Sequence, residues 1–374
     1  MIPSLKICEY TEQLRQGGLL RTRAVSNSSL LAFDSNDYLS LLGDKRIAQA
    51  YEYGFKHYAS GSGASMLLSG YHRNHQEIEE AFSQLLDVDA CIIFSSGYAA
   101  NLALTLLLGA IDTHCIIDKA IHASMYDGLS LSKASFCRFL HNDLTSLSQK
   151  INKYPENAVV ITEGIFSMSG QRAPLSAISQ LTHKRIPLLV DEAHAFGVLG
   201  EQGKGATSLH QLSQEDVPLR MISFGKAFAG QGAIIAGKQE WITALLQAGR
   251  SIIYSTAISP ALSYGLLKTL DIVVAADERR EKLHRLIDFF KDKIKLSPFE
   301  WAKSDSAIQQ LQLGCPHRAL FYADKLKEKG FSCSPIRTPT VNMKATGLRI
   351  VLNYRHTPEQ INSLFTALHT LYEH

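Results

Sequence analysis

Long apolar runs are scarce in this chain of 374 residues. The longest, residues 99–111, is too short to span a bilayer and contains Asn101 and Thr105, so it predicts a buried helix. The first residues include Lys6 and Glu9, which a secretory signal peptide would not carry in this arrangement. We therefore expect a soluble protein with neither a membrane-spanning segment nor a signal peptide.

Clusters of one charge sign are missing too. Lys and Arg total 38 and Asp and Glu total 35, which gives a formal net charge of +3, and no stretch is rich in Lys and Arg. Proteins that bind nucleic acid usually concentrate positive charge on one face, so the composition does not favour that class. We expect small-molecule substrates, without nucleic acid or membrane as partners.

Closely spaced cysteine pairs of the CxxC type are also absent. Widely spaced cysteines are typical of reduced core thiols in a cytoplasmic protein, not of disulfides or a zinc site. His72 and His75 are three residues apart, but no acid or cysteine cluster completes a metal-binding set. We interpret them as structural or surface histidines and predict no metal site. The six cysteines are Cys8, Cys91, Cys115, Cys137, Cys315 and Cys333.

What the chain does contain is an alternation of apolar strand-like runs and helix-like patterns between residues 90 and 237. This alternation predicts an α/β fold with a doubly wound, mostly parallel sheet. Beyond residue 260, a long charged helical stretch is followed by three strand-like runs, which predict a smaller α+β domain. A chain of this length exceeds a single ordinary core, so two domains are expected.

The domain boundaries follow from this pattern. We expect an N-terminal segment at 1–40 that packs with the small domain, a large domain at 41–265 and a small C-terminal domain at 266–374. The small domain should contain strands at 307–314, 331–337 and 347–353.

Residues 187–197, PLLVDEAHAFG, are the centre of the predicted site. Three large aliphatic residues precede Asp191 and His194, a pattern typical of a buried parallel strand that carries polar groups at its carboxyl end. Such strand ends are where open α/β sheets bind ligands. Asp191 alone would more often be a helix-capping or loop carboxylate, but Lys226 also follows an apolar run. A carboxylate and a lysine at neighbouring strand ends are the main groups that pyridoxal phosphate (PLP) requires.

Other polar residues follow the predicted strands of the same sheet. Gly97 and Tyr98 open a helix, where free backbone N–H groups favour a phosphate, although an ordinary strand–turn–helix junction has the same pattern. The glycine-rich loop at 61–70 has Met66 where a dinucleotide fingerprint needs glycine, so a nucleotide-binding oxidoreductase is not supported. The residues expected to converge are Gly97, His122, Glu163, Ser167, Asp191, His194, Ser223 and Lys226.

These motifs together resemble the α-oxoamine synthases, fold-type-I PLP enzymes that join an amino acid to an acyl thioester with loss of carbon dioxide. The resemblance extends over almost the whole chain and keeps the family's order of motifs. The matching stretches are SNDYLSL (35–41), SGYxxxHxxIE (69–79), SSGYAAN (95–101), HND (141–143), TEGIFSMSG (162–170), DEAHAFGVLGEQGKG (191–205), SFGKAF (223–228), IIYST (252–256) and RxPTV (337–341).

The resemblance implies a role for each matching residue. Lys226 would bind PLP covalently and act on the α-proton, Asp191 would pair with the pyridinium nitrogen, and His122 would stack on the ring and assist catalysis. Arg337 would hold the amino acid carboxylate, although a solvated arginine is a common alternative. Arg21, with Arg23 as a rival, and Thr340 would contact the acyl substrate. The remaining cofactor contacts would be Gly97, Tyr98, Ser167, His194 and Ser223.

The chain departs from the family pattern at a few positions. Ser223 stands where threonine is usual, which keeps the hydroxyl, and Ala227 and Ala229 stand where glycines are usual. Glu192 should point away from the site, so its substitution should have little effect. Asp191→Asn should keep the fold and lose most turnover.

The resemblance also implies the reaction. The short N-terminus and the motifs TEGIFSMSG, GEQGKG and IIYST favour L-alanine and a pimeloyl thioester, carried by CoA or by acyl-carrier protein, in biotin biosynthesis. A homodimer is expected. Two alternatives remain open: glycine or serine with another acyl-CoA, or a PLP-fold subunit without catalysis. His141 in the HND motif disfavours the glycine–acetyl member of the family, where asparagine is expected.

Overall fold

The computed structural model describes residues 3–183 and 185–372. Its residues form two compact units, each of which is described by itself. The smaller unit comprises Met1–Asn36, Ser167–Gln171 and Lys282–His374, and the larger comprises Asp37–Phe166 and Arg172–Glu281. Helix α12 (Asp277–Ile294) contributes its first residues to the larger unit and the rest to the smaller one.

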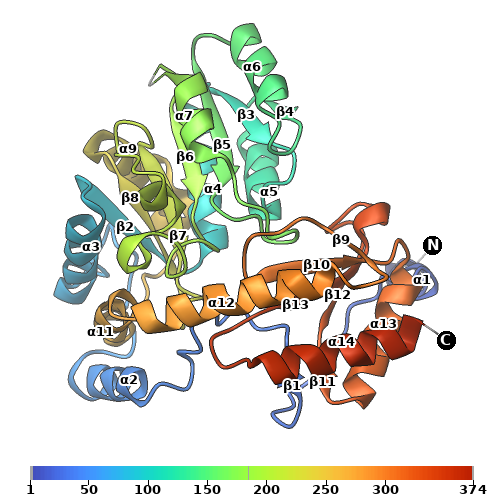
Figure 1. The fold of residues 1–374 in the computed structure, drawn as a ribbon. Helices are drawn as coiled ribbons and strands as arrows, with labels where there is room; N and C mark the ends of the chain where they lie inside the picture. Colours follow the sequence, from blue (N-terminus) through green and yellow to red (C-terminus); the bar gives the residue numbers. More distant parts are fainter. Residues whose placement is uncertain (1–2, 184, 373–374) are drawn as a thin grey trace. The chain divides into compact units, whose positions relative to one another are not determined.

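The larger unit is built on a seven-stranded sheet with the order β2-β8-β7-β6-β5-β3-β4 (Figure 1). The strands from β7 to β4 run parallel, while β8 is antiparallel to both β2 and β7. The mostly parallel sheet predicted from the sequence is therefore confirmed. The strands are β2 (Ala90–Phe94), β3 (His114–Asp118), β4 (Phe136–Phe139), β5 (Ala158–Glu163), β6 (Leu188–Asp191), β7 (Leu219–Ser223) and β8 (Ala233–Gly237).

Helices pack against this sheet. Helix α4 (Gly97–Ala110) is the predicted buried helix, and it packs against β7, β8 and α5 (Ala123–Ser132). It begins where Ser96 accepts a hydrogen bond from the backbone N–H of Ala99, an N-cap that satisfies one of the helix's free donors. The other helices of this unit are α2 (Lys45–His57), α3 (Arg73–Leu86), α6 (Leu144–Lys153), α7 (Leu175–Thr182), η1 (Glu201–Gly203), α8 (Ala206–Leu209), α9 (Gln239–Ala248), α10 (Arg250–Ile253) and α11 (Pro260–Val274).

The smaller unit contains a four-stranded antiparallel sheet with the order β12-β13-β10-β9, and a short parallel pair of β1 with β11. Helix α13 packs on β12 and β13, and α14 packs on α13. The elements are α1 (Pro3–Gln16), β1 (Leu31–Ala32), β9 (Glu300–Trp301), β10 (Ile308–Gln312), α13 (Pro316–Glu328), β11 (Phe331–Ser332), β12 (Ser334–Ile336), η2 (Met343–Ala345), β13 (Gly347–Val351) and α14 (Pro358–Tyr372).

Two details differ from the sequence-based expectation. The single long helix expected after residue 260 is two helices, α11 and α12, and the strand expected at 331–337 is divided into β11 and β12, which belong to different sheets. The compact units divide at Glu281, later in the chain than the expected boundary at residue 265. The reason is that α11 packs on α2 and α3 and so belongs with the larger unit.

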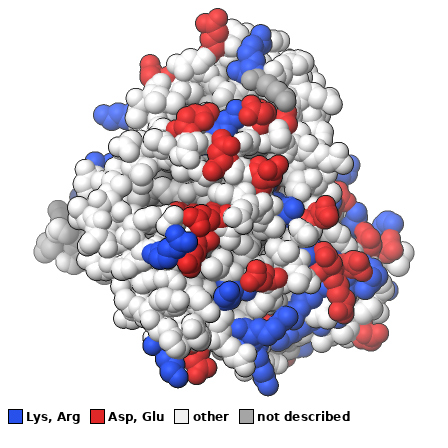
Figure 2. Space-filling view, turned by 90° about the vertical axis from the view of Figure 1, so that its left-hand side faces the viewer, with Lys and Arg blue, Asp and Glu red and all other residues white. Residues whose placement is uncertain are grey.

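Charge is dispersed on the molecular surface. Figure 2 shows Lys and Arg interspersed with Asp and Glu on the face that it presents, in keeping with the small net charge. Within residues 3–183 and 185–372, no helix is long and apolar enough to cross a membrane. The six cysteines are free thiols.

Candidate active site

The larger unit contains a pocket at the carboxyl ends of β5, β6 and β7. The residues predicted from the sequence at these strand ends converge there. Seven of the predicted cofactor and catalytic residues line it, together with Glu163 at the end of β5. The pocket is lined by Gly97, Tyr98, Asn101, His122, Glu163, Asp191, Ala193, His194, Met221, Ser223 and Lys226.

Asp191 is the last residue of β6, and only 5% of its surface is exposed. Its Oδ1 accepts a hydrogen bond of 2.9 Å from the backbone N–H of Ala193, and its Oδ2 accepts one of 3.1 Å from Asn101 Nδ2. Both donors approach the carboxylate from the protein, so they fix its orientation at the wall of the pocket. Asp191 thus makes the local hydrogen bond to Ala193 that is expected of a loop carboxylate, and it also lines the pocket.

Asn101 is a site residue for which the sequence analysis predicted no role. It lies on α4 and is 1% exposed, and its Nδ2 also donates to Ser124 Oγ at 2.9 Å. Its Oδ1 is buried and has no hydrogen-bond partner in the described part of the chain. One signal was available in the sequence, because Asn101 is a polar residue within the longest apolar run. A buried amide in such a run needs a partner, and here the partner is Asp191.

His122 stands at the N-terminus of α5. Its Nδ1 lies 2.8 Å from Ser124 Oγ and accepts a hydrogen bond of 3.3 Å from the Ser124 backbone N–H. Burial lowers the pKa of the His122 imidazole; the nearby Asp191 carboxylate opposes this shift and Lys226 adds to it. The structure therefore favours a neutral ring at this position.

His194 lies beside Tyr38 in the same unit. Tyr38 Oη is 2.6 Å from His194 Nδ1, and both side chains are buried. Tyr38 lies in the SNDYLSL motif, but it was not among the residues predicted for the site. Because Tyr38 and His194 are 156 residues apart in the chain, no local pattern indicates this contact.

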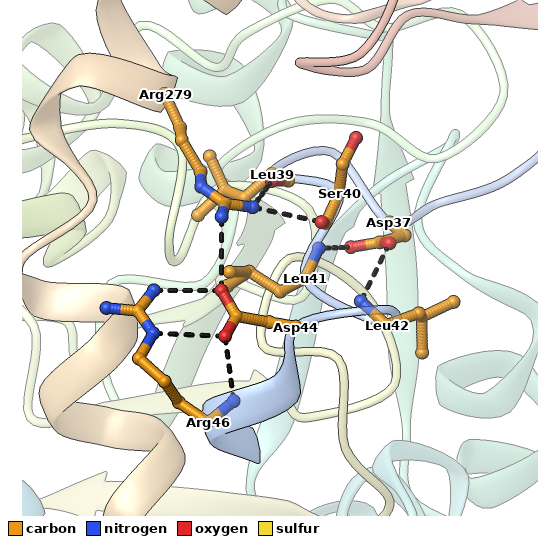
Figure 3. Close-up of polar contacts among 8 residues, drawn as sticks. All are labelled: Asp37, Leu39, Ser40, Leu41, Leu42, Asp44, Arg46 and Arg279. Atoms are coloured by element: carbon orange, nitrogen blue, oxygen red, sulfur yellow. Dashed lines mark hydrogen bonds and ion pairs between the residues drawn. The ribbon is translucent and has the colours of Figure 1, made fainter. Parts of the chain in front are cut away.

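The loop that carries Tyr38 is held by several hydrogen bonds (Figure 3). Arg279 of α12 donates to the carbonyls of Leu39 and Ser40 and pairs with Asp44 at 3.1 Å. Asp44 also pairs with Arg46, and these contacts lower the pKa of Asp44 to about 2. An ionised Asp44 therefore holds one end of the loop.

At the other end of this loop, the Asp37 carboxylate accepts from the backbone N–H groups of Leu41 and Leu42. Together with the Arg279 contacts, these bonds leave few backbone groups of the segment free to rearrange. Tyr38, between the two sets of contacts, is therefore presented to His194 by a constrained segment.

Lys226 lies in the turn that follows β7. Phe224 and Phe228 flank it in sequence and pack on each other with ring centroids 4.7 Å apart, and both rings pack on Phe82. The Ala229 N–H donates to the Lys226 carbonyl at 2.9 Å. Ala229 itself has φ +54°, in the left-handed region that favours glycine, which accounts for the glycine usual at this position. The lysine therefore stands on a turn anchored in the core.

Gly97 and Tyr98 form the first turn of α4, where backbone N–H groups have no partner within the helix, and both residues line the pocket. A Cβ at Gly97 would lie 3.5 Å from Met221 and Ser223, so glycine keeps this wall open. Tyr98 is 46% exposed and donates to Asp127 at 2.6 Å. The pocket thus has a helix N-terminus suited to a phosphate.

The surroundings of Glu192 argue against the expectation that its substitution has little effect. Its side chain does point away from the pocket, as expected, but it is completely buried. Its oxygens accept hydrogen bonds from the backbone N–H groups of Ala206 and Thr207 and from the Thr207 hydroxyl. Burial raises the pKa of Glu192, and the bonds from Thr207 oppose that shift. Since these donors depend on Glu192, its substitution should destabilise the protein.

The other predicted site residues belong to the smaller unit. Arg21 donates to Thr340 Oγ1 at 3.2 Å, so the two residues predicted to contact the acyl substrate lie together. Arg337 donates to the carbonyls of Gly18 and Leu20. Burial lowers the pKa of Arg337, and the nearby Arg21 lowers it further.

Ser167 also belongs to the smaller unit and is buried. Its carbonyl accepts a hydrogen bond of 2.7 Å from Arg349 Nε, and Arg349 Nη2 donates to Asn36 Oδ1. Arg349 lies on β13, is 6% exposed and was not among the residues predicted for the site. A charged residue in the middle of an apolar strand pattern was the available signal.

The family Aminotransferase class I and II matches residues 28–368. The chain is 36% identical to an 8-amino-7-oxononanoate synthase of Nitrosomonas eutropha, over 99% of each chain. It is similar to the crystal structure of an 8-amino-7-oxononanoate synthase from Francisella tularensis, with a TM-score of 0.81 and 31% identity, over 93% of this chain and 99% of the other. The chain therefore belongs to the aminotransferase class I and II family, and the resemblance to the α-oxoamine synthases is confirmed.

A further likeness concerns the fold alone. A solved structure described as SPT with PLP has a TM-score of 0.88 to this chain at 24% identity, over 98% of this chain and 97% of the other. The fold-type-I architecture predicted from the sequence is confirmed by these comparisons.

Proposed function

We propose that this protein is a PLP-dependent acyltransferase that condenses L-alanine with a pimeloyl thioester. The products are 8-amino-7-oxononanoate, carbon dioxide and the free thiol, and the reaction belongs to biotin biosynthesis. Full-length relatives that carry this synthase name support the assignment. The observation that carries it is the pocket in which Asp191, His122 and Lys226 meet.

The residues of the pocket fit PLP. Lys226 supplies the amine that would hold the cofactor covalently, and the buried Asp191 carboxylate supplies an acceptor for the ring N–H. Imidazole rings of His122 and His194 and the Ser223 hydroxyl complete the set of groups, and the start of α4 suits the phosphate. When bound, PLP withdraws electrons from the α-carbon of the amino acid, so that bonds at that carbon can break.

The chain's own groups then have defined tasks. The Lys226 amine accepts and returns the α-proton, and Asp191 is held in place by its two N–H donors. The amino acid α-carbon bonds to the thioester carbonyl carbon, the thiol leaves, and the carboxylate is lost as carbon dioxide. His122 assists that loss as a hydrogen-bond donor.

Two arginines are candidates for the amino acid carboxylate. Arg337 is the residue implied by the family motif, while Arg349 is bonded to Ser167, which we expect at the cofactor. The contact with Ser167 favours Arg349. Arg21 and Thr340, which are bonded to each other, are proposed to contact the acyl chain.

We also propose a homodimer in the cytoplasm. The family resemblance implies the dimer, and the free thiols of all six cysteines fit a reducing compartment. Light scattering at working concentration tests the dimer, and a monomeric mass would contradict it.

The reaction is tested by a substrate survey. Purified protein with added PLP is incubated with L-alanine, glycine or L-serine and with acyl-CoA donors of different length, and pimeloyl-carrier protein is compared with pimeloyl-CoA. We expect release of thiol and carbon dioxide with L-alanine and a pimeloyl donor. Selective turnover with glycine or serine would instead assign another α-oxoamine synthase.

Cofactor binding is tested by absorbance. The protein with PLP should be yellow, and Lys226→Ala should lose that absorbance, while the exposed Lys45→Ala serves as the matched control. A wild-type protein that stays colourless with PLP would remove the enzyme assignment and favour a subunit without catalysis.

A further inference from the structure

Three buried side chains and the more exposed His122 form a continuous chain of hydrogen bonds along one wall of the pocket. It runs from His122 Nδ1 to Ser124 Oγ at 2.8 Å, from Ser124 Oγ to Asn101 Nδ2 at 2.9 Å, and from Asn101 Nδ2 to Asp191 Oδ2 at 3.1 Å. The residues come from the start of α5, from α4 and from the end of β6. The chain connects the residue expected over the cofactor ring with the residue expected at its nitrogen.

The direction of each bond follows from donor chemistry. The Asp191 carboxylate oxygen can only accept, so Asn101 presents its NH₂ group and not its carbonyl. The same NH₂ group donates to Ser124 Oγ, which leaves the single hydroxyl proton of Ser124 for His122. Asn101 Oδ1 has no partner in the described part of the chain, so the donor side alone orients this amide.

The hydrogen bond from the Ser124 backbone independently indicates which ring nitrogen of His122 carries the proton. The Ser124 backbone N–H can only donate, and it points at His122 Nδ1. Nδ1 is therefore an acceptor toward two donors from the same residue. In the neutral ring the proton must then be on Nε2.

We propose that Asn101 and Ser124 are positioning residues that hold His122 as the neutral tautomer with its proton on Nε2. Asp191 determines this arrangement, because its carboxylate orients the Asn101 amide, and the Asn101 amide in turn orients Ser124. This inference rests on the proposed function for its purpose, which is to present a hydrogen-bond donor, and not a base, to the bound substrate. If Nδ1 were protonated, its N–H would be a third donor that faces the backbone N–H and the hydroxyl of Ser124.

The surrounding charges act on the same ring from several elements. Asp191 at the end of β6 and Asp127 on α5 favour protonation, whereas Lys226 after β7 disfavours it. Glu163 and His194 line the same pocket. Burial is the largest influence and lowers the pKa of His122. The pKa of His122 should therefore lie below the ordinary imidazole value of about 6.5.

The decisive measurement is the ring-nitrogen NMR spectrum of the full-length protein labelled with ¹⁵N-histidine, recorded with and without PLP across the acid range. His122→Gln assigns the signal. We expect an unprotonated Nδ1 and a protonated Nε2, with a midpoint below that of exposed histidines. A proton on Nδ1, or an ordinary midpoint, would overturn the proposal. This measurement uses the wild-type protein and so does not depend on any variant folding.

Two variants test the linkage. Ser124→Ala removes one donor to Nδ1 and Asn101→Ala disconnects Ser124 from Asp191, so both should raise the His122 midpoint and lower kcat about tenfold, with little change in the KM for the thioester. Thr105→Val is the matched control, since Thr105 is buried on the same helix and bonds only to helix carbonyls. Variants that leave the midpoint unchanged would refute the linkage.

The outcome is separable from that of the proposed function. The tautomer is measured without turnover, so a wild-type protein that makes no aminoketone would disprove the function and leave the tautomer result standing. An active synthase whose His122 carries its proton on Nδ1 would disprove only this inference.

Discussion

Tyr38 and His194 are joined by a buried contact of 2.6 Å between Tyr38 Oη and His194 Nδ1. His194 lines the pocket, while Tyr38 is 1% exposed and lies between Asp37 and Leu39, whose contacts Figure 3 shows. A hydrogen bond to one ring nitrogen fixes the ring's orientation and what the other nitrogen can offer. The phenol thus positions the imidazole that we expect at the cofactor's ring oxygen.

Tyr38→Phe removes only this hydroxyl. A buried hydrogen bond contributes about 1 kcal/mol, so we expect kcat to fall about five- to tenfold and the visible absorbance of the PLP-bound protein to shift. Steady-state kinetics and an absorbance spectrum measure the two effects. Tyr53→Phe, at an exposed position on α2, is the control. If the two variants behave alike, Tyr38 does not position His194.

Glu192 and Asp191 should show opposite phenotypes although they are adjacent. Glu192→Ala leaves the buried N–H groups of Ala206 and Thr207 without their acceptor, so we expect the free energy of unfolding to fall by about 3 kcal/mol. Asp191→Asn should change it by less than about 1 kcal/mol but abolish most turnover. Urea titrations and thiol-release assays on both variants test this, and a fully stable Glu192→Ala would contradict it.

The two arginines of the smaller unit can be separated kinetically. Arg349→Lys should raise the KM for L-alanine about tenfold, because lysine cannot hold a carboxylate bidentately. Arg337→Lys should affect that KM less, since its Nη1 is bonded to the carbonyls of Gly18 and Leu20. The KM for the thioester is the internal control. The reverse order would assign the carboxylate to Arg337, as the motif alone implied.

His356 should make the protein sensitive to acid. It is buried, its Nε2 donates to the Ala32 carbonyl and its Nδ1 accepts from the Asn353 N–H, while burial lowers its pKa to about 4. The unfolded chain binds this proton at about 6.5, so the stability that neutral His356 contributes is present above about pH 6.5 and is lost as the pH falls toward about 4.

The loss between these pH values is on the order of 3 kcal/mol. Urea midpoints measured across that range should therefore fall steeply for the wild type and less steeply for His356→Gln, which has no proton to take up. Parallel pH profiles for the two proteins would show that another group dominates acid unfolding.

Much of the site followed from local patterns. Apolar runs that end in polar residues mark parallel strands, and parallel strands place their carboxyl ends at one edge of a sheet, so Asp191, His194, Ser223 and Lys226 were correctly predicted to converge. Periodicity likewise predicted α2, α3 and α14 close to their observed bounds. These features depend on the spacing of residues along the chain, so they can be recognised in a single sequence.

The sequence by itself determined the fold class, the family and the strand-end residues, because those depend on residue spacing. Only the tertiary structure decided which partner each buried polar group has. Asn101 meets Asp191 across 90 residues, Tyr38 meets His194 across 156, and Glu192 is bonded to Ala206 and Thr207. A buried polar group needs a hydrogen-bond partner. The packing of the helices and strands decides which donor reaches it, and the hydrophobic periodicity of the sequence does not show how these elements pack.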